Sequence, residues 1–294
     1  MLSPVTLPDP HAPLLDCPAV ALPPLCDPPP RTRMNPQLAA HRSHDYLYLR
    51  ERWADLCPRA GLQMHDLATI SDYPLHWISS PAADEGATPA IYVSTGIHGD
   101  EPGSVWGLLE WAEENIPLFA AHPFLIFPCL NPYGLVHNTR VDEEGRDLNR
   151  SFHLEGHPLI SAWNAVMEHR RVDVFFNLHE DYDAQGIYMY ELSASGDDCG
   201  RRILDECGAV LPLDGRLEIE GRAATQGLIL RRTIPEGLPG MPESIAAFAR
   251  GVRLAITFES PSEFALTDRI AVHKAFLTAA LRHACGISTA PQPT

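Results

Sequence analysis

Residues 95–103, Thr95-Gly96-Ile97-His98-Gly99-Asp100-Glu101-Pro102-Gly103, join a predicted strand to a predicted helix. The apolar run at 90–94 is short and bounded by proline and glycine, which is typical of a buried strand. A helix is expected from Pro102, because proline suits a first helical position and apolar residues then recur at helical spacing. His98 and Glu101 are therefore expected at the carboxyl end of a strand, where α/β sheets hold their ligands.

The pair His98-x-x-Glu101 is weak evidence by itself, because a helix-start glutamate beside a hydrogen-bonded histidine has the same spacing. A third candidate ligand, His179, follows a second strand-like run at 172–178. Catalytic zinc typically takes three protein ligands, often two histidines and one carboxylate, and leaves a fourth position for water. His98, Glu101 and His179 fit that set, so we interpret them as ligands of one Zn²⁺ ion.

The segment between these residues is rich in arginine and asparagine. Asn131-Pro132-Tyr133-Gly134 is interpreted as a turn after a strand at 124–129, and Arg140 and the run Gly-Arg-Asp-Leu-Asn-Arg-Ser-Phe at 145–152 follow it. Guanidinium groups beside an amide suit the binding of a carboxylate and the stabilisation of an oxyanion. A solvated loop has the same composition, and composition alone favours that plainer interpretation.

An acidic residue, Glu259, stands near the end of a predicted strand at 254–261. Glutamate is depleted in strands, so this one is expected either on an edge strand or beside a functional site. Zinc hydrolases need a proton acceptor beside the metal, and a partly desolvated carboxylate suits that task.

Six motifs, in order along the chain, resemble the signature of the carboxypeptidase A superfamily. They are His98-x-x-Glu101, Asn131-Pro132-x-Gly134, Arg140, Asp147-Leu148-Asn149-Arg150, Leu178-His179 and Thr257-Phe258-Glu259. More narrowly, the chain resembles the branch that holds succinylglutamate desuccinylase, aspartoacylase and related bacterial carboxypeptidase-like proteins. The resemblance covers residues 90–262, and it is specific because each motif has its own chemical task.

The resemblance implies a site with one zinc ion and several assisting side chains. The implied zinc ligands are His98, Glu101 and His179. The other implied roles are Glu259 as general base and acid, Arg140 polarising the scissile carbonyl and stabilising the oxyanion, Asn149 and Arg150 gripping the substrate carboxylate, and Asp147 orienting a ligand histidine.

Substrate preference is less well defined by the sequence. Glu180 and Asp181 directly follow His179 and add negative charge beside the expected metal, which would favour cationic groups in the substrate. Members of the family place a tyrosine or an arginine on the loops after the last ligand histidine. The candidates here are Tyr182, Tyr188, Tyr190, Arg222, Arg231 and Arg232, and the sequence does not decide among them; Tyr188 and Tyr190 are more simply two aromatics on one face of a strand.

The implied reaction is hydrolysis of an amide bond next to a free carboxylate. The first hypothesis is a metallocarboxypeptidase that acts on small peptides, and the second is a deacylase of N-acyl amino acids, as in the desuccinylase and aspartoacylase branch. Both would use the same core. A third hypothesis is a non-catalytic binding protein on the same scaffold, and a serine hydrolase is unsupported because the chain has no G-x-S-x-G motif.

Composition limits the classes of partner. The net charge of −16 argues against nucleic acid, which requires a basic patch. No run approaches the roughly 20 apolar residues of a membrane span, so no membrane association is expected. The seven cysteines are scattered without C-x-x-C spacing, which indicates reduced thiols and a cytoplasmic location.

The chain is expected to contain one catalytic domain. Residues 1–33 hold ten of the 28 prolines and predict a disordered extension, with a partner-binding polyproline segment as the alternative and a secretory signal excluded. Residues 34–288 are predicted to form a single zinc carboxypeptidase-like catalytic domain, and residues 289–294 a disordered tail.

The remaining elements alternate in the manner of an α/β protein. Helices are predicted at 38–56, 158–170, 194–211, 242–252 and 266–285, and a hairpin at 63–70 and 74–79. This alternation, like the resemblance, implies a three-layer α/β/α fold with a mixed, mostly parallel central sheet.

Overall fold

The structure is a computed structural model that describes residues 42–196 and 198–289. The predicted extension at 1–33 lies outside the described residues, as does nearly all of the predicted tail at 289–294. The domain boundaries therefore stay predictions.

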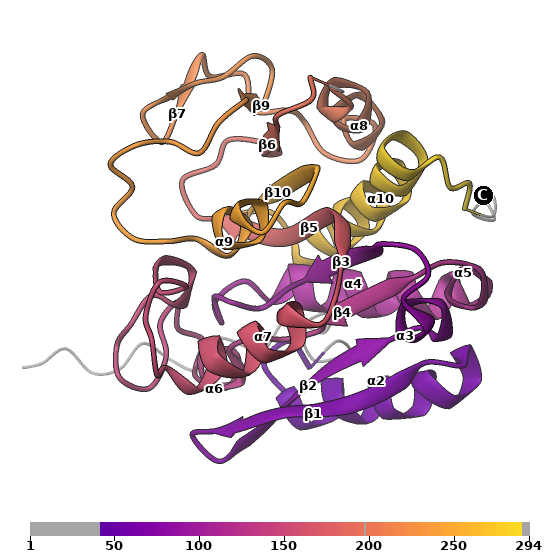
Figure 1. The fold of residues 1–294 in the computed structure, drawn as a ribbon. Helices are drawn as coiled ribbons and strands as arrows, with labels where there is room; N and C mark the ends of the chain where they lie inside the picture. Colours follow the sequence, from indigo (N-terminus) through magenta and orange to yellow (C-terminus); the bar gives the residue numbers. More distant parts are fainter. Residues whose placement is uncertain (1–41, 197, 290–294) are drawn as a thin grey trace, which may run out of the picture. The chain divides into compact units, whose positions relative to one another are not determined.

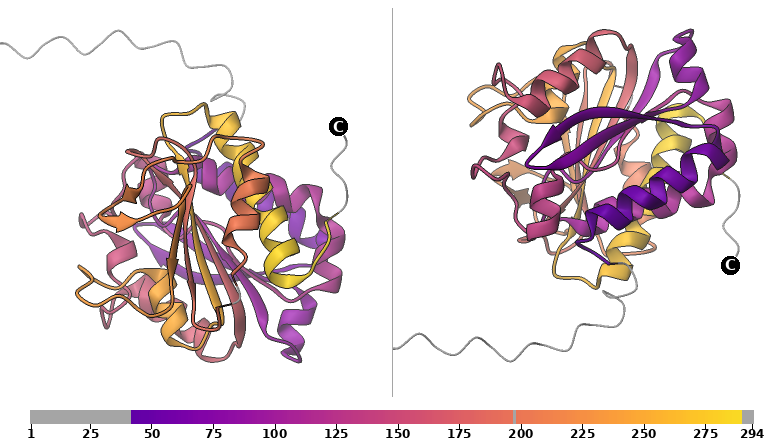
Figure 2. Two further views of the ribbon diagram at one scale, coloured as in Figure 1. Left: turned by 90° about the horizontal axis from the view of Figure 1, so that it is seen from above. Right: turned by 90° about the horizontal axis from the view of Figure 1, so that it is seen from below.

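An eight-stranded mixed sheet lies between two layers of helices (Figures 1 and 2). Its strands in spatial order are β1 (Gln63–Ile70), β2 (Tyr73–Ser79), β4 (Phe124–Phe127), β3 (Ala90–Ser94), β5 (Val172–Asp181), β10 (Leu254–Pro261), β6 (Tyr188–Ser193) and β9 (Leu228–Arg231). The four central strands β4, β3, β5 and β10 are parallel, and β6 and β9 are parallel to each other. The pairs β1–β2, β2–β4 and β10–β6 are antiparallel. The predicted α/β/α fold with a mixed sheet is confirmed.

The helices divide between the two faces of the sheet. The core on one face holds α2 (Tyr46–Ala60), α4 (Pro102–Glu114), α5 (Ile116–Ala121), α8 (Gly200–Cys207) and α10 (Leu266–Cys285). The core on the other face holds α7 (Pro158–Glu168) and α9 (Glu243–Ala249). Shorter elements are α3 (Pro81–Glu85), α6 (Pro132–His137), the 3-10 helix η1 (Leu148–Arg150), and the two-residue strands β7 (Glu218–Ile219) and β8 (Arg222–Ala223).

Strand β3 illustrates why this sheet is covered on both faces. All five of its residues are buried. Ile91 and Val93 pack with the α4 and α10 side, whereas Ala90 and Tyr92 pack with the α7 and α9 side. Successive side chains of a strand point to opposite faces, so a continuous apolar run requires a helix layer on each.

Four of the five helices predicted above have different bounds in the structure: α7 and α9 differ by one to three residues at an end, and two helices differ more. The helix predicted at 38–56 begins at Tyr46 among the described residues, because the Asp45 side chain accepts a hydrogen bond from the Tyr48 amide and caps the first turn. The helix predicted at 194–211 spans only Gly200–Cys207. Its start is fixed by the buried Glu191 carboxylate, which accepts the backbone N–H of Gly200 at 2.7 Å.

The segment predicted as a turn at 131–134 is instead the start of helix α6. Asn131 Oδ1 accepts a hydrogen bond from the Gly134 amide at 2.9 Å, and Pro132 occupies the first helical position. The turn prediction was wrong because asparagine and proline favour both turns and helix starts. The loop that carries His98 packs directly on this helix, and a Cβ atom on Gly99 would lie 1.7 Å from the carbonyl carbon of Gly134.

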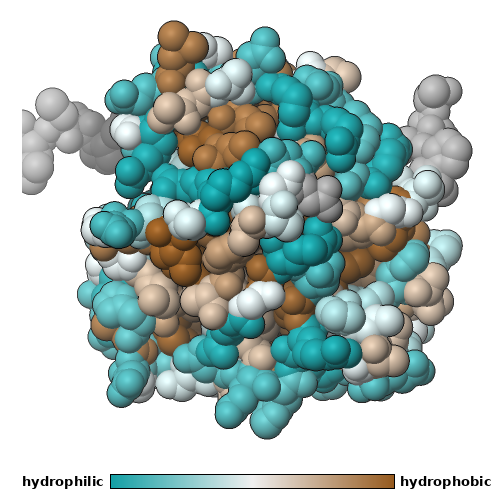
Figure 3. Space-filling view, turned by 45° about the horizontal axis from the view of Figure 1, so that its top comes forward, coloured by the Kyte–Doolittle hydropathy of each residue, from teal (hydrophilic) through white to brown (hydrophobic). Residues whose placement is uncertain are grey.

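On the face drawn in Figure 3, hydrophobic residues are interspersed among hydrophilic ones. Within residues 42–196 and 198–289, none of the helices combines the length and the hydropathy that a membrane crossing requires.

A buried carboxyl group, Glu243, joins α9 to β3. It accepts hydrogen bonds from the hydroxyl groups of Tyr92 and Ser94, the latter at 2.9 Å. Burial raises the pKa of Glu243 to about 7, although these two hydrogen bonds act in the opposite direction. The group is therefore expected to be protonated in the folded protein at mildly acidic pH.

This shift predicts a pH-dependent difference in stability between the protein and a Glu243→Gln variant. Between the usual pKa near 4.5 and the folded value near 7, only the folded state keeps the proton, so the free energy of unfolding falls as pH rises. Glutamine cannot ionise. From pH 5 to pH 8 the free energy of unfolding of the variant should therefore rise, relative to that of the wild type, by about 3 kcal/mol. Urea denaturation at both pH values measures it. A difference that stays constant with pH would contradict this assignment.

Candidate metal centre and substrate pocket

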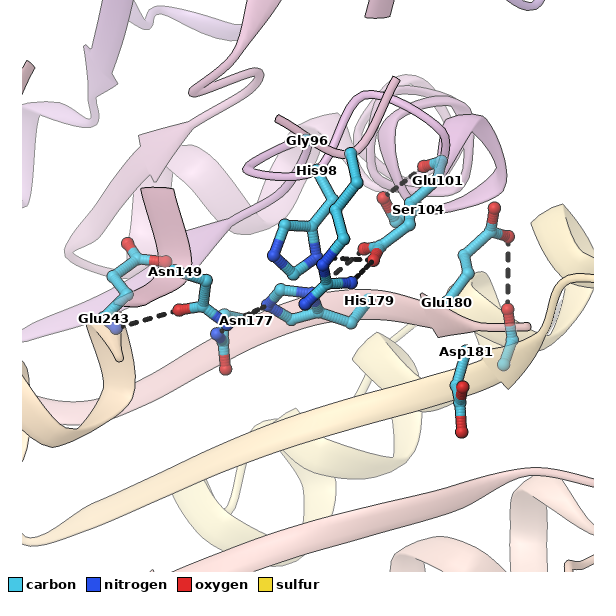
Figure 4. A network of polar contacts seen from close by, with 12 residues as sticks. Gly96, His98, Glu101, Ser104, Asn149, Asn177, His179, Glu180, Asp181 and Glu243 are labelled. Carbon is cyan, nitrogen blue, oxygen red and sulfur yellow. Dashed lines mark hydrogen bonds and ion pairs between the residues drawn. The ribbon is translucent and has the colours of Figure 1, made fainter. Parts of the chain in front are cut away.

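Three side chains converge at the carboxyl edge of the sheet (Figure 4). His98 lies in the loop after β3, Glu101 is the residue before α4, and His179 is on β5, with exposed fractions of 2%, 3% and 1%. His98 Nδ1 is 2.6 Å from Glu101 Oε1, and His179 Nδ1 is 2.9 Å from Glu101 Oε2. One ligand atom from each residue lies within 4.8 Å of the others.

This donor set fits a zinc ion. Two imidazole nitrogens and one carboxylate oxygen are a common ligand set of catalytic zinc. Burial would raise the pKa of Glu101, but His98 and His179 outweigh it and hold the pKa well below its usual value. The carboxylate is thus ionised, as a metal ligand must be.

The second ring nitrogen of each histidine also has polar neighbours. His98 Nε2 is 3.1 Å from Asp147 Oδ1, and His179 Nε2 is 3.1 Å from Asn177 Nδ2 and 3.4 Å from Asn149 Nδ2. Both Nδ1 atoms are therefore the ones that face Glu101. In metal sites the second ring nitrogen of a histidine commonly donates to a carboxylate or carbonyl oxygen, as His98 Nε2 would to Asp147.

Arg140 and Asp147 form an ion pair beside the proposed ligands. Arg140 Nη2 lies 3.1 Å from Asp147 Oδ2, and Arg140 Nη1 lies 3.7 Å from Glu101 Oε1. Burial acts to raise the pKa of Asp147, but the hydrogen bond to His98 and the charge of Arg140 hold it well below its usual value. The Arg140 side chain is 44% exposed, so its guanidinium can also contact a ligand.

A pocket of about 580 Å³ opens beside these side chains, within the usual size range of ligand sites. The predicted site residues that line it are His98, Glu101, Arg140, Asn149, Arg150, His179 and Glu259. Asp147 is the predicted site residue that is not part of the lining; it contacts His98 and Arg140 instead.

Glu259 lies in the middle of the sheet and not on an edge strand. In the parallel pairing of β10 with β5 it is the partner of His179, and on its other side it is the partner of Tyr188 in β6. Burial raises the pKa of Glu259 well above its usual value, as do the neighbouring charges of Glu101, Glu220 and Asp181, whereas Arg140 acts in the opposite direction. A carboxyl group with a raised pKa suits proton transfer near neutral pH.

The charge of Glu180 is compensated within the protein. Its Oε2 atom is 2.6 Å from Arg269 Nη1 on α10, and it also accepts the Gly103 amide and the Ser260 hydroxyl group. Glu180 nevertheless lines the pocket, so the expectation that Glu180 and Asp181 favour cationic substrate groups stays a prediction. Asp181 lines the pocket and accepts a hydrogen bond from the Tyr188 hydroxyl group at 3.0 Å.

Five of the six substrate-contact candidates from the sequence line the pocket. Tyr182, Tyr188, Tyr190, Arg222 and Arg231 line it, whereas Arg232 forms an ion pair with Asp198 at 2.5 Å and is not part of the lining. The Arg231 guanidinium carbon lies 5.6 Å from the centre of the Tyr190 ring.

Glu220 and Asn177 also lie at the site, but the sequence did not predict them. Glu220 lines the pocket and accepts a hydrogen bond from the Tyr190 hydroxyl group at 2.5 Å, and no motif marks it. Asn177 stands two residues before His179 in a strand, and residues at that spacing share a face of the sheet. That spacing was the signal that could have identified it.

Comparisons with known proteins agree with this geometry. Residues 87–185 match the family model described as the succinylglutamate desuccinylase/aspartoacylase catalytic domain. Cytosolic carboxypeptidase 3 from Mus musculus is 30% identical over 146 residues, which cover 45% of this chain and 14% of that protein.

Solved structures share the fold. A protein from Shewanella amazonensis, provisionally assigned as a metallopeptidase, has a TM-score of 0.72 at 22% identity and covers 82% of this chain and 93% of its own. A metallo-carboxypeptidase from Burkholderia cenocepacia has a TM-score of 0.59 at 18% identity, and the match covers 80% of this chain and 69% of that protein. These likenesses show a fold shared with metallo-carboxypeptidase-like proteins, and the family match at 87–185 covers the segment that holds His98, Glu101 and His179.

Proposed function

We propose that this protein is a zinc-dependent hydrolase that cleaves an amide bond next to a free carboxylate, and that it acts as a metallocarboxypeptidase on small peptides. The observation that supports this most is the convergence of His98, Glu101 and His179 in one pocket with Glu259. A location in the cytoplasm is part of the same proposal, because the scattered cysteines suit a reducing compartment.

The proposed roles follow from where each side chain lies. Zn²⁺ held by His98 Nδ1, Glu101 and His179 Nδ1 would polarise the substrate carbonyl and make water more acidic. Glu259 would accept the proton of the attacking water and pass it to the leaving amine. Arg140, which is partly exposed, would donate hydrogen bonds to the oxyanion that forms on the former carbonyl.

The substrate carboxylate is assigned to Arg150 and Asn149. Both line the pocket, and both belong to η1, next to Asp147. Asn149 Oδ1 already accepts a hydrogen bond from the Glu243 backbone N–H at 3.0 Å. The Asn149 NH₂ group is therefore the part of this side chain that remains to contact a ligand, as a donor. Arg150 would supply the charge and Asn149 one further donor.

Peptides and N-acyl amino acids both carry an amide bond next to a free carboxylate. The two substrate classes must therefore be compared directly. Zinc-loaded protein should be incubated with a dipeptide panel and with acetyl- and succinyl-amino acids, and the released amino acids measured. Release from dipeptides alone supports the carboxypeptidase, and release from N-acyl amino acids alone supports the deacylase. Inactivity on both panels would refute the proposed hydrolase and favour the non-catalytic binding protein.

Two arginines in the pocket lining, Arg222 of β8 and Arg231 of β9, favour substrates with a second negative charge. Among the described residues, Arg222 and Arg231 form no ion pair with a carboxylate. Burial, followed by the neighbouring charge of Arg222, lowers the pKa of Arg231. An anion bound between these two cations would offset their mutual repulsion. An acidic side chain of a peptide or a dicarboxylic acyl group could supply it.

We therefore expect Arg231→Met to raise KM for acidic substrates by about 10-fold or more, the effect of one lost hydrogen bond to a charged group. The value of kcat should change less, because Arg231 has no proposed role in metal binding or proton transfer. Arg232→Met is the matched control, since Arg232 pairs with Asp198 away from the pocket. Equal effects of Arg231→Met on acidic and neutral substrates, measured by steady-state kinetics, would refute the role of this charge.

A further inference from the structure

Asn177 has a side-chain amide that is only half satisfied. It lies on β5 two residues before His179, is 1% exposed, and its Nδ2 atom is 3.1 Å from His179 Nε2. Its oxygen, Oδ1, is buried without a hydrogen-bond partner among the described residues. Figure 4 shows Asn177 and Asn149 next to the His179 ring, which has Glu101 at its other nitrogen.

The neighbouring amide of Asn149 has a fixed orientation. The backbone N–H of Glu243 donates to Asn149 Oδ1 at 3.0 Å, and a backbone N–H can only donate. Asn149 therefore turns its NH₂ group toward His179 Nε2, at 3.4 Å. It cannot serve as a hydrogen-bond acceptor for this ring.

The two tautomers of His179 make opposite demands on these amides. When Nδ1 carries the proton, it donates to Glu101 Oε2, and Nε2 accepts hydrogen bonds from the amides. When Nδ1 binds a metal, the neutral ring carries its proton on Nε2 and needs an acceptor there. His98 Nε2 has such an acceptor in Asp147. His179 Nε2 instead faces two donors, the NH₂ groups of Asn177 and Asn149.

We propose that Asn177 is a positioning residue of the metal site, whose side-chain amide turns by half a rotation so that Oδ1 accepts the Nε2–H of metal-bound His179. The oxygen and nitrogen of an amide are nearly the same size, so the rotation needs no extra space. Asn177 would then hold the tautomer of His179 that offers Nδ1 to the metal, as Asp147 would for His98. The inference rests on the zinc binding that the proposed function requires.

Two substitutions separate hydrogen bonding from packing. Asn177→Leu has a similar size but neither donates nor accepts, and it should weaken Zn²⁺ binding by about 10- to 100-fold. Asn177→Asp retains an acceptor and should restore most of that affinity. Affinity is measured by competition with a coloured chelator, and the Co²⁺ absorption spectrum reports the geometry of the ligands independently of activity.

The control is a buried asparagine outside the site. Asn115 is 5% exposed at the end of α4 and donates to the Trp111 carbonyl oxygen at 2.8 Å, so Asn115→Leu should alter Tm but not Zn²⁺ affinity. The Tm of each metal-free variant shows whether it folds. A second measurement needs no variant to be stable: ¹⁵N NMR of zinc-loaded wild-type protein should show an Nε2–H proton of His179 that exchanges slowly.

The outcomes are distinct. If wild-type protein binds no Zn²⁺, both the proposed function and this inference are refuted. If wild-type protein and Asn177→Leu bind Zn²⁺ equally well, or if Asn177→Asp binds no better than Asn177→Leu, only the role of Asn177 is refuted. A fast-exchanging Nε2 proton in the zinc-loaded protein would also overturn it.

Discussion

Replacing Glu259 with glutamine is expected to lower kcat by about 100- to 10,000-fold, the usual contribution of a general acid or base. Glutamine has nearly the same size but cannot take up a proton. Glu259 is not one of the three proposed ligands, so the variant should still bind one Zn²⁺ ion per chain. The rate is measured with the best substrate of the panels described above, and zinc content by elemental analysis.

The matched control for this substitution is Glu263→Gln. Glu263 is exposed, lies shortly after β10 and does not line the pocket, so its replacement should leave kcat unchanged. If Glu259→Gln binds zinc and turns over at the wild-type rate, Glu259 is not the proton acceptor. A loss of both zinc and activity would instead indicate that Glu259 helps to hold the metal.

Replacing Glu101 with glutamine is expected to reduce Zn²⁺ affinity by well over 100-fold and to abolish turnover with it. Glu101 is the carboxylate that both Nδ1 atoms face, at 2.6 and 2.9 Å. A neutral amide would remove the charge and would point an NH₂ group at one of the two rings. Loss of a hydrogen bond behind a metal ligand already costs about 10- to 100-fold, so loss of the anionic ligand should cost more.

Asp100→Asn tests whether this effect is specific to the ligand. Asp100 is the adjacent acidic residue, lines the same pocket and is exposed. Its replacement removes one negative charge near the metal but none of the three proposed ligands, so Zn²⁺ affinity should stay close to that of the wild type. Full zinc occupancy in Glu101→Gln, measured at low micromolar metal, would refute the proposed ligand set.

The central strands could be predicted from the sequence because each is a short apolar run with clear ends. The bounds predicted for β3, β10 and α10 are those of the structure. These elements are buried on both faces or begin and end at strong signals, such as Gly286 after α10. Local sequence therefore agreed with tertiary packing.

Other parts of the fold depend on contacts between distant residues. Arg269, 89 positions after Glu180, compensates the charge of Glu180, and no local sequence pattern predicts such a pair. Strands β7 and β8 are two residues long and have no apolar alternation to detect. The identity of Asn177 as a neighbour of His179 follows from strand spacing, but its unsatisfied oxygen is visible only in three dimensions.

The contact between Gly99 and Gly134 makes the backbone that supports His98 intolerant of change. The loop that carries His98 touches the backbone of α6 so closely that neither position has room for a methyl group, since a Cβ on Gly134 would also lie 2.5 Å from the Asn131 side chain. Attempts to redesign substrate range should therefore leave these two glycines unchanged and mutate the pocket residues of β8 and β9, Arg222 and Arg231. Among related proteins, sequence variation is expected at these two pocket positions more than at Gly99 and Gly134.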